Sequence, residues 1–535
     1  MRRYRAFAAA GVAAAISCAG AGGDSEDTSL VGSIALPDTE YPWPVRNSVL
    51  PVCVSHADGF HEPTLAAPMG QIKFDLGAPM LARGRVQRVG LRVIDPETGQ
   101  TDHLVSGDFD VETSPGLVIV STASLAGGRG EVSVVAEEVG DQHLSVVWDA
   151  DASVAGRVEV RAYESQLPIW ELNVAPDDLA RIVDSPDETI TIDGNLIIQG
   201  QPYATALRIH GGSSRYYPKK SFRFDLTNGL SLPTGQDHLI LRAEWNDKTM
   251  LRNHLAFDLI YRSSHIPAVR TEAVHFRINE RYYGVMWHVE RVDGDFLRAR
   301  ALDPAASLYE ASPASQFWEP GGGLYPLVDH AAYEGTYEHK KGDHGYDDLI
   351  ELIEGTVAAS DDEFAQRVAD EVKLDEILVY LALMAALQSK DHIKKNYYLY
   401  RDDDTVEDRW RILPWDLDLT FGHLWTEEDQ VLDETIFLQH QPRAGHEDMG
   451  WAPHNLLFTR LWRDPGVDAR FSEHLRVILE RFFVEGVVGP VVDNALCLMM
   501  PDLLADTRKR ASNEEYLERV EELFGFMAGR SAFLN

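Results

Sequence analysis

The sequence predicts a mixed α+β fold, in which a β-sandwich-like domain precedes a larger two-lobed domain. Three observations predict it. Short alternating runs such as GLVIVSTAS and GRVEVRAYE fill the N-terminal part, hairpin patterns follow from about residue 166, and apolar helical runs dominate after about residue 293. At 535 residues, the chain is also longer than one typical hydrophobic core requires.

The first 23 residues have the character of a secretory leader and tether. An Arg-rich start is followed by an Ala-rich apolar run and then by small residues. The run ends in AISC at Cys18, which resembles a lipobox, whose cysteine is lipidated after cleavage. We therefore expect an extracytoplasmic protein that is either a cell-envelope lipoprotein or, alternatively, secreted without a lipid. No later apolar run is expected to span a membrane.

Residues 24–165 are predicted to form the β-rich N-terminal domain. Gly, Asp and Pro turns separate its short strands, as in a sandwich. The region contains no cluster of catalytic residue types, so its ligand is not predicted. Cys53 lies here and Cys497 lies near the C-terminus; whether the two form a disulfide is left open by the sequence.

The charge of the chain excludes one class of partner. Lys and Arg number 49 and Asp and Glu number 85, which gives 49 − 85 = −36. Nucleic-acid binding needs a basic surface that neutralises phosphates, so we expect no nucleic-acid partner.

Residues 166–535 are predicted to form one domain of two lobes, about 166–292 and about 293–535. The first lobe contains hairpins, with a tight-turn signal at Asp193–Gly194, and one helix whose cap is expected at Asn246 or Asp247. The second is mostly helical, and LDEILVYLALMAALQSK is its most apolar helix.

A polar constellation in the second lobe has the residue types of a phosphoryl-transfer site. Asp391 and Asn396 are five positions apart after the apolar helix, and Asp416 and Asp418 follow the strand RWRIL. A catalytic Asp, a metal-binding Asn five positions later and a further metal-binding Asp have this spacing in protein kinases. We predict that a hairpin brings Asn396 and Asp416 together. A polar turn without chemistry is the alternative.

The first lobe contains residue types that bind phosphate. The stretch RIHGGSSRYYPKKSF includes Arg208, Gly211, Gly212, Ser213, Ser214, Lys219 and Lys220. Glycines let backbone amides approach an anion, and hydroxyl and lysine side chains add donors. Strand alternation places Lys219 and Lys220 on opposite faces, so only one is expected to reach phosphates. The alternative is a surface turn with two solvated lysines.

Five segments together resemble the CotH kinase family, which is named after a spore-coat protein and consists of atypical protein kinases. They are RIHGGSSRYYPKKSFRFDL, WNDKTMLRNHLAFDLI, HFRINERYYGVMWHVERVDGDFL, DHIKKNYYLYRD and ILPWDLDLTFG, in the family's order over about residues 166–425. The resemblance implies an atypical protein-kinase-like fold for residues 166–535.

The resemblance also implies an activity, which is transfer of the ATP γ-phosphate to Ser or Thr of a partner protein with Mg²⁺, or alternatively Mn²⁺. It implies that Asp391 is the catalytic Asp and that Asn396 and Asp416 are metal ligands, with Asp418 beside them. Lys219 or Lys220 would contact the phosphates near the HGGSS loop. Glu290, in the link between the lobes, would lie near the adenine or support the hinge.

Two other functions compete with an active kinase. A catalytically silent surface-binding or adhesion module would keep the fold and lose the chemistry, and it would suit a location where ATP is scarce. A metal-dependent phosphohydrolase would use the Asp cluster without the lysine pair. The phosphoacceptor and the oligomeric state are not predicted.

Overall fold

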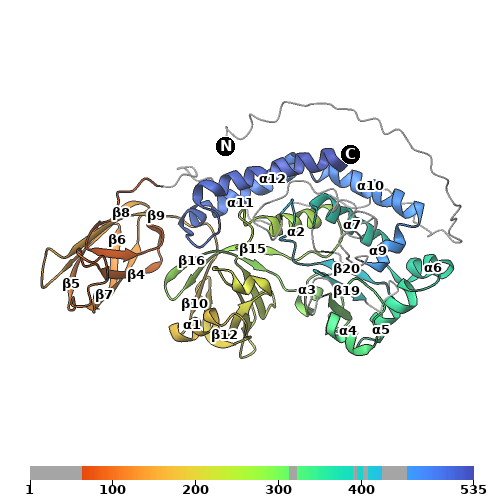
Figure 1. The fold of residues 1–535 in the computed structure, drawn as a ribbon, viewed down its shortest axis with the longest axis horizontal. Coiled ribbons are helices and arrows are strands. Elements are labelled where there is room, and N and C mark those ends of the chain that lie inside the picture. Colours follow the sequence, from red (N-terminus) through yellow and green to blue (C-terminus); the bar gives the residue numbers. More distant parts are fainter. Residues whose placement is uncertain are drawn as a thin grey trace.

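The computed structural model describes residues 63–311, 322–389, 392, 395–401, 408–423 and 455–534. Figure 1 shows a β-rich domain at one end, a barrel in the middle, and a mostly helical part with its own sheet at the other end. The long C-terminal helices extend across the top of the barrel and of the helical part. The predicted mixed α+β fold with an N-terminal β domain is confirmed.

The N-terminal β domain consists of two sheets around one core. The strand order is β1-β9-β8-β5, with β3 on β9, in one sheet and β2-β4-β7-β6 in the other. Val89, Val132 and Val146 are fully buried between them, because alternate residues of each strand point inward. The strands are β1 (Met69–Gly70), β2 (Ile72–Asp75), β3 (Met80–Ala82), β4 (Val86–Val93), β5 (Phe109–Thr113), β6 (Leu117–Ala126), β7 (Arg129–Ala136), β8 (Gly140–Trp148) and β9 (Ala155–Tyr163).

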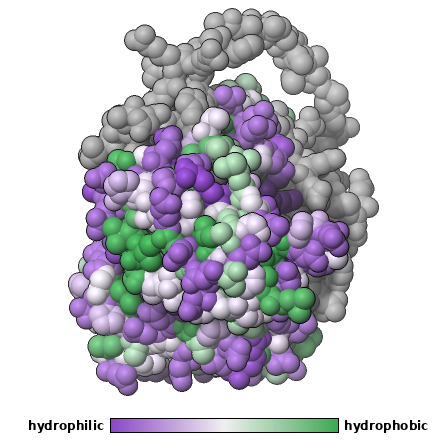
Figure 2. Space-filling view, turned by 90° about the vertical axis from the view of Figure 1, so that its left-hand side faces the viewer, coloured by the Kyte–Doolittle hydropathy of each residue, from purple (hydrophilic) through white to green (hydrophobic). Residues whose placement is uncertain are grey.

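The outer end of this domain has apolar side chains among hydrophilic ones. Figure 2 views the molecule from this end and shows green groups interspersed with purple. The exposed apolar residues of the domain include Val118, Ile119 and Val120 on the edge strand β6, and Leu104 and Val139 in loops. A partial solvent exposure of single apolar residues is ordinary for a folded protein.

The barrel closes in the order β10-β11-β12-β13-β14-β16-β15. A parallel pairing of β10 with β15 completes it, and the other pairs are antiparallel. The elements are β10 (Ile169–Asn173), α1 (Pro176–Asp184), β11 (Ile192–Ile198), β12 (Gln201–His210), the 3-10 turn η1 (Ser213–Tyr216), β13 (Ser221–Leu226), β14 (His238–Arg242), α2 (Arg252–Ser263), β15 (Thr271–Ile278) and β16 (Arg281–Val289).

The tight turn predicted at Asp193–Gly194 is wrong, because both residues lie within strand β11. The turn of this hairpin is at Gln199 and Gly200, whose φ angles of 50° and 84° suit a two-residue hairpin connection. Gly194 is there for packing: a Cβ atom would lie 2.9 Å from the Leu207 side chain. Gly194 therefore marks a close contact between neighbouring strands of the barrel.

Helix α2 is capped by Asp247, one of the two predicted residues, although Asp247 is not adjacent to the helix. The N-cap position is Leu251, whose side chain offers no cap. Instead, the Asp247 carboxylate accepts hydrogen bonds from the backbone amides of Leu251 at 3.0 Å and Arg252 at 2.9 Å. The buried Arg252 guanidinium also pairs with this carboxylate. The capping carboxylate thus satisfies amide donors that a helix start leaves open.

The helical part contains a four-stranded sheet in the order β18-β17-β19-β20 and packs around one large core with α2. The apolar helix predicted after residue 373 is confirmed as α7, which is buried on nearly all sides. The elements are α3 (Gly294–Arg298), β17 (Ser307–Ala311), α4 (His330–Thr336), β18 (Tyr337–Lys341), α5 (Asp347–Ile350), the π-helical turn η2 (Glu351–Val357), α6 (Asp361–Glu371), α7 (Leu374–Leu387), β19 (Tyr397–Arg401), β20 (Arg411–Pro414), α9 (Leu456–Leu461), α10 (Pro465–Arg481), α11 (Glu485–Ala505) and α12 (Asn513–Leu534).

Helix α11 corrects the expectation that no later segment has the length and composition of a membrane span. Its 21 residues pass by those two criteria, with a mean hydropathy of 1.4. However, 56% of the apolar window is buried inside the protein, and its side chains belong to the large core. The hydropathy of α11 is therefore accounted for by its packing. Cys497 on this helix is disulfide-bonded, and its partner lies outside the described residues.

The end of α11 joins the N-terminal domain to the barrel. The buried Asp502 carboxylate accepts hydrogen bonds from Tyr163 of β9 at 3.0 Å and from Ser165 at 2.9 Å. The same carboxylate lies 2.6 Å from His275 Nδ1 on β15. One side chain thus binds groups from the sandwich, the linker and the barrel. Removing it would leave several buried polar groups without partners.

Three histidines, of which His254 is buried and His210 and His288 are half-buried, predict a loss of stability in mild acid. Burial is the main cause that lowers the pKa of each histidine. The pKa of His210 falls to about 3, with a further contribution from the Arg242 cation, and that of His254 falls to about 3, with a contribution from Arg262. The pKa of His288 falls to about 4. Between pH 6.5 and these values the unfolded chain binds protons that the folded chain does not, so stability falls as the pH falls. Each of these histidines should lower the free energy of unfolding by about 2 kcal/mol at pH 5 relative to pH 7.

Chemical denaturation at pH 7 and pH 5 measures this effect. In the variant His254→Gln the stability difference between the two pH values should be smaller by about 2 kcal/mol, whereas His103→Gln, at an exposed position, should retain the full difference. An identical pH dependence in the wild type and in His254→Gln would contradict the assignment of neutral buried histidines.

Candidate functional site

A hairpin brings Asn396 and Asp416 together, as predicted. Tyr397 of β19 pairs with Pro414 of β20, so the residues flanking the two strands meet at the open end of the hairpin. The Trp415 amide donates to the Asn396 carbonyl at 3.0 Å, and Asn396 Nδ2 lies 3.4 Å from the Asp416 carbonyl. Both Asn396 and Asp416 have positive φ angles, 63° and 50°. Such strained backbone in non-glycine residues is concentrated at functional sites.

Arg242 on barrel strand β14 faces this hairpin end and contacts three carboxylates. Its guanidinium pairs with Asp416, with Asp418 at 3.3 Å, and with Glu244 at 2.9 Å. Burial alone would raise the pKa of Asp416, but the Arg242 cation outweighs it and holds that pKa below its usual value. Burial likewise raises the pKa of Glu244, and Arg242 only partly offsets it. Asp416 is therefore ionised next to a fixed cation.

Asn253 on α2 connects these groups to the helix. Its amide nitrogen donates to Glu244 at 3.1 Å, and its side-chain oxygen accepts from the Leu417 amide at 3.0 Å. The side chain is buried and satisfied on both sides. The first turn of α2 thus fixes the backbone between Asp416 and Asp418 relative to the barrel.

The barrel face near Asp416 has a row of basic residues. Leu207, Ile209, Phe222, Phe224, Leu239 and Leu241 belong to the barrel core. Arg208, His210, Arg223 and Arg242 alternate with them and therefore share the opposite face. Arg208 is directly paired with Arg223 across β12 and β13. Burial and the neighbouring Arg223 cation lower the pKa of Arg208. Arg223 also pairs with Asp225 at 2.9 Å, and Arg242 pairs with three carboxylates, so the positive charge of this face is partly compensated.

The two candidate lysines have partners other than the hairpin end. The Lys219 ammonium is fully buried and donates to Asp506 at 2.7 Å and to the Val285 carbonyl at 2.6 Å. Burial lowers its pKa, although Asp506 partly compensates. Lys220 Nζ donates to the Arg215 carbonyl at 2.6 Å, which closes the turn η1. Arg242 pairs with Asp416, and the nearby Lys395 also helps to hold the pKa of Asp416 below its usual value.

The glycine-serine loop lies at the surface next to this face. Gly211, Gly212 and Ser213 are exposed, and Ser214 is half-buried. The loop connects β12, which contains Arg208 and His210, to the turn η1. Its backbone is therefore accessible to a ligand on the basic face.

Glu290 follows β16 and lies in the link between the barrel and the helical part. Its carboxylate pairs with Arg300 at 2.5 Å and accepts from the Arg270 amide at 2.9 Å. These bonds join the end of the barrel to the segment after α3. The contacts suit a residue that supports the hinge.

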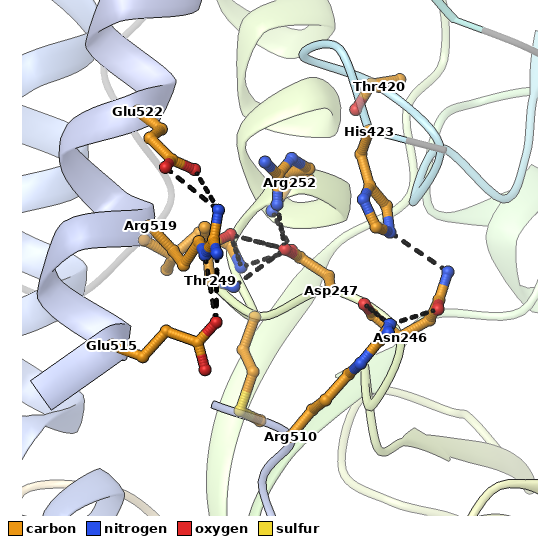
Figure 3. Close-up of polar contacts among 12 residues, drawn as sticks. Asn246, Asp247, Thr249, Arg252, Thr420, His423, Arg510, Glu515, Arg519 and Glu522 are labelled. Atoms are coloured by element: carbon orange, nitrogen blue, oxygen red, sulfur yellow. Dashed lines mark hydrogen bonds and ion pairs between the residues drawn. The ribbon is translucent and has the colours of Figure 1, made fainter. Parts of the chain in front are cut away.

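A second polar network holds the segment before α2 and the segment after Asp418 (Figure 3). Asn246 Nδ2 lies 3.1 Å from His423 Nε2, and Arg510 donates to the Asn246 side chain at 2.9 Å. On α12, Arg519 contacts both Glu515 and Glu522. The C-terminal region therefore supports the loop that contains Glu244.

Asp391, the candidate catalytic residue, lies outside the described residues, as do Cys18 and Cys53. The described neighbours on either side of it are Ser389 and His392, both buried. The Ser389 carbonyl lies 3.1 Å from His392 Nδ1.

The hairpin end has donors that suit a divalent cation. In the described part of the chain, no group of three or more His, Cys, Asp or Glu side chains forms a ready metal centre. However, Mg²⁺ in phosphoryl-transfer sites uses few protein ligands and takes the rest from phosphates and water. Two carboxylates, Asp416 and Asp418, together with the Asn396 carboxamide supply hard oxygen donors. These residues fit Mg²⁺ or Mn²⁺.

Sequence reasoning missed Arg242, Arg223, Glu244 and Asn253 as site residues. A signal was present, because RIH, FRF and LRA place an arginine at an alternating position of three successive strands that pair in the barrel. The sequence-based prediction favoured the lysine pair because the two lysines are close to the glycines in sequence. Adjacency in sequence does not decide where a long side chain finds its partner.

The barrel, the helical part and the hairpin end define a kinase-type domain. The family model described as CotH kinase protein matches residues 207–534, more than half of the chain. The chain belongs to the CotH kinase family.

One solved structure is similar at a low level. It is the HipA, HipB and operator DNA complex of a toxin–antitoxin system from Shewanella oneidensis MR-1, with 13% identity and a TM-score of 0.22, covering 66% of this chain and 74% of that chain. A likeness at this level carries no further conclusion. No curated protein matches the chain significantly.

Proposed function

We propose that the chain is an extracytoplasmic atypical protein kinase, which transfers the γ-phosphate of ATP to Ser or Thr of a partner protein with Mg²⁺ or Mn²⁺. One observation carries the proposal. The Asn396, Asp416 and Asp418 donors face a barrel surface with Arg208, Arg223 and Arg242, so metal ligands and phosphate-binding cations converge.

In this proposal each group has a role. The arginine-bearing face and the loop from Gly211 to Ser214 bind the phosphates, and Asn396 and Asp416 hold the metal, with Asp418 beside them. When bound, the metal neutralises charge on the phosphates. Lys219 stabilises the barrel through Asp506 instead of reaching the nucleotide.

The transfer step requires a proton acceptor. The acceptor hydroxyl oxygen forms a bond to the γ-phosphorus, the bond from that phosphorus to the ADP oxygen breaks, and the hydroxyl proton moves to the Asp391 carboxylate. The Arg242 side chain would balance charge on the phosphates.

Calorimetric titration of ATP into residues 24–535 tests the nucleotide site. With Mg²⁺ or Mn²⁺ we expect saturable binding that EDTA removes. Asp416→Ala should abolish metal-dependent binding, because it removes a charged metal ligand. Asp343→Ala, which removes a 98% exposed carboxylate, should bind as the wild type does. Binding that survives both EDTA and Asp416→Ala would contradict the assigned metal site.

A silent binding module is the second candidate function, and the Arg242 contacts favour it. A guanidinium that pairs with both Asp416 and Asp418 already compensates the charges that a metal would neutralise. If the folded wild-type protein bound no ATP with either metal, this second function would replace the kinase proposal.

We also propose that the mature protein is anchored by a lipid on Cys18. The leader-like residues 1–23 and the AISC stretch support it. Intact-mass spectrometry of detergent-extracted protein should show a mature N-terminus at Cys18 with added acyl mass, and Cys18→Ala should lose that mass. An unmodified mature N-terminus in the wild type would exclude the anchor.

A further inference from the structure

A cavity of about 380 Å³ lies along one face of α2. His254, Phe257, Asp258 and Tyr261 line it and recur at the spacing of one helix face. Its other walls are the connection from α2 to β15, the segment after α3 and the start of β20. His254 follows Asn253 in the first turn of α2, but none of the candidate nucleotide-site residues lines the cavity.

The walls of the cavity are rigid. Arg300 donates to the carbonyls of Ala268 and Phe296, both at 3.1 Å, as well as to Glu290. Its guanidinium also lies 3.7 Å from the centre of the Phe296 ring. His254 stacks on Trp287 with 4.7 Å between ring centres, and its Nδ1 lies 2.6 Å from the Thr271 hydroxyl. The cavity therefore does not depend on a loose side chain.

Arg270 is a cation at the rim of the cavity. It lines the cavity and is exposed, and no ion pair of Arg270 is found among the described residues. Other arginines around the cavity pair with acidic side chains: Arg262 with Asp258 at 2.7 Å, Arg300 with Glu290 at 2.5 Å, and Arg411 with Glu376 at 3.6 Å. Arg270 therefore offers a positive charge to a ligand that enters from solvent.

The remaining lining is apolar and provides a surface for a hydrocarbon body. Phe257, Ile266, Ala268 and Val269 are buried, and Leu302 is half-buried. A ligand with one negative charge and an apolar part matches this combination of walls.

We propose that this cavity binds a small organic carboxylate, whose charged group pairs with Arg270 and whose apolar part packs against Phe257 and Leu302. The proposal does not depend on kinase activity. It concerns a second site, which shares α2 with the hairpin end and Arg300 with the Glu290 link.

A ligand-observed NMR titration of benzoate into the full chain, without nucleotide or metal, tests the proposal. Benzoate should bind with a Kd on the order of 1 mM, as expected for so small a ligand. Benzamide, which has nearly the same shape and no charge, should bind up to about fivefold more weakly, since an exposed ion pair contributes up to about 1 kcal/mol.

Two variants and two matched controls locate the binding. Arg270→Gln should weaken benzoate binding about fivefold by removing the unpaired charge. Ala299→Trp fills the cavity from an exposed wall position and should abolish binding. Arg298→Gln and Ala305→Trp change exposed residues that do not line the cavity, so both should bind as the wild type does.

Three results would overturn the proposal: no saturable benzoate binding by the folded wild type, equal binding of benzamide, or wild-type affinity in Ala299→Trp. A fourth arm separates this site from the nucleotide site. ATP with Mg²⁺ should not displace benzoate, and displacement would assign benzoate to the basic barrel face and overturn the proposal.

Discussion

Replacing Asp391 with Asn is expected to reduce phosphoryl transfer about 10²–10⁴-fold while leaving nucleotide binding largely intact, because the amide cannot accept the hydroxyl proton. The measurement is incorporation of radiolabelled phosphate from ATP into casein and into the chain itself. Calorimetry on the same variant should give an ATP affinity within about twofold of the wild type.

The control for this variant is Asp343→Asn, which changes an exposed carboxylate and should transfer phosphate at the wild-type rate. Undiminished transfer in Asp391→Asn would exclude Asp391 as the proton acceptor. If the wild-type protein bound nucleotide and transferred nothing to either acceptor, the silent module would be favoured over a kinase.

The variant Lys219→Met is expected to destabilise the protein by about 3–5 kcal/mol, because it leaves the buried Asp506 carboxylate without its cation. Asp506 also accepts from the Val285 and Arg508 amides at 3.0 and 2.9 Å, so the carboxylate cannot simply turn toward water. The free energy of unfolding in urea measures the effect.

Lys220→Met is the matched control. It should lower the free energy of unfolding by only about 1 kcal/mol, which is the contribution of one hydrogen bond. The double variant Lys219→Met with Asp506→Asn should recover part of the loss. A stable Lys219→Met variant with weakened ATP affinity would instead indicate that Lys219 binds the nucleotide, as the sequence suggested.

The fold class, α7 and the β19–β20 hairpin were predictable because each rests on local periodicity. In the helix from Leu374 to Leu387 and in strands such as YYLYR, the same residues that determine the pattern also make the core. The meeting of Asn396 and Asp416 followed from the hairpin alone.

The partners of long charged side chains were not predictable in this way. Lys219 and Asp506 are 287 residues apart, and Arg242 and Asp416 are 174 apart. No local pattern selects such a pair, since it depends on how the barrel and the C-terminal helices pack. The predicted Asp193–Gly194 turn was wrong for another reason: the need for a small residue next to Leu207 arises from the way the paired strands β11 and β12 pack in the barrel.

The barrel is attached to the helical part and to the C-terminal helices by several separate polar pairs. They include Glu290 with Arg300, Lys219 with Asp506, His275 with Asp502, and Arg242 with Asp416. Attachment at several places restrains rotation as well as sliding. Any opening between the barrel and the helical part would therefore first have to break at least one of these pairs.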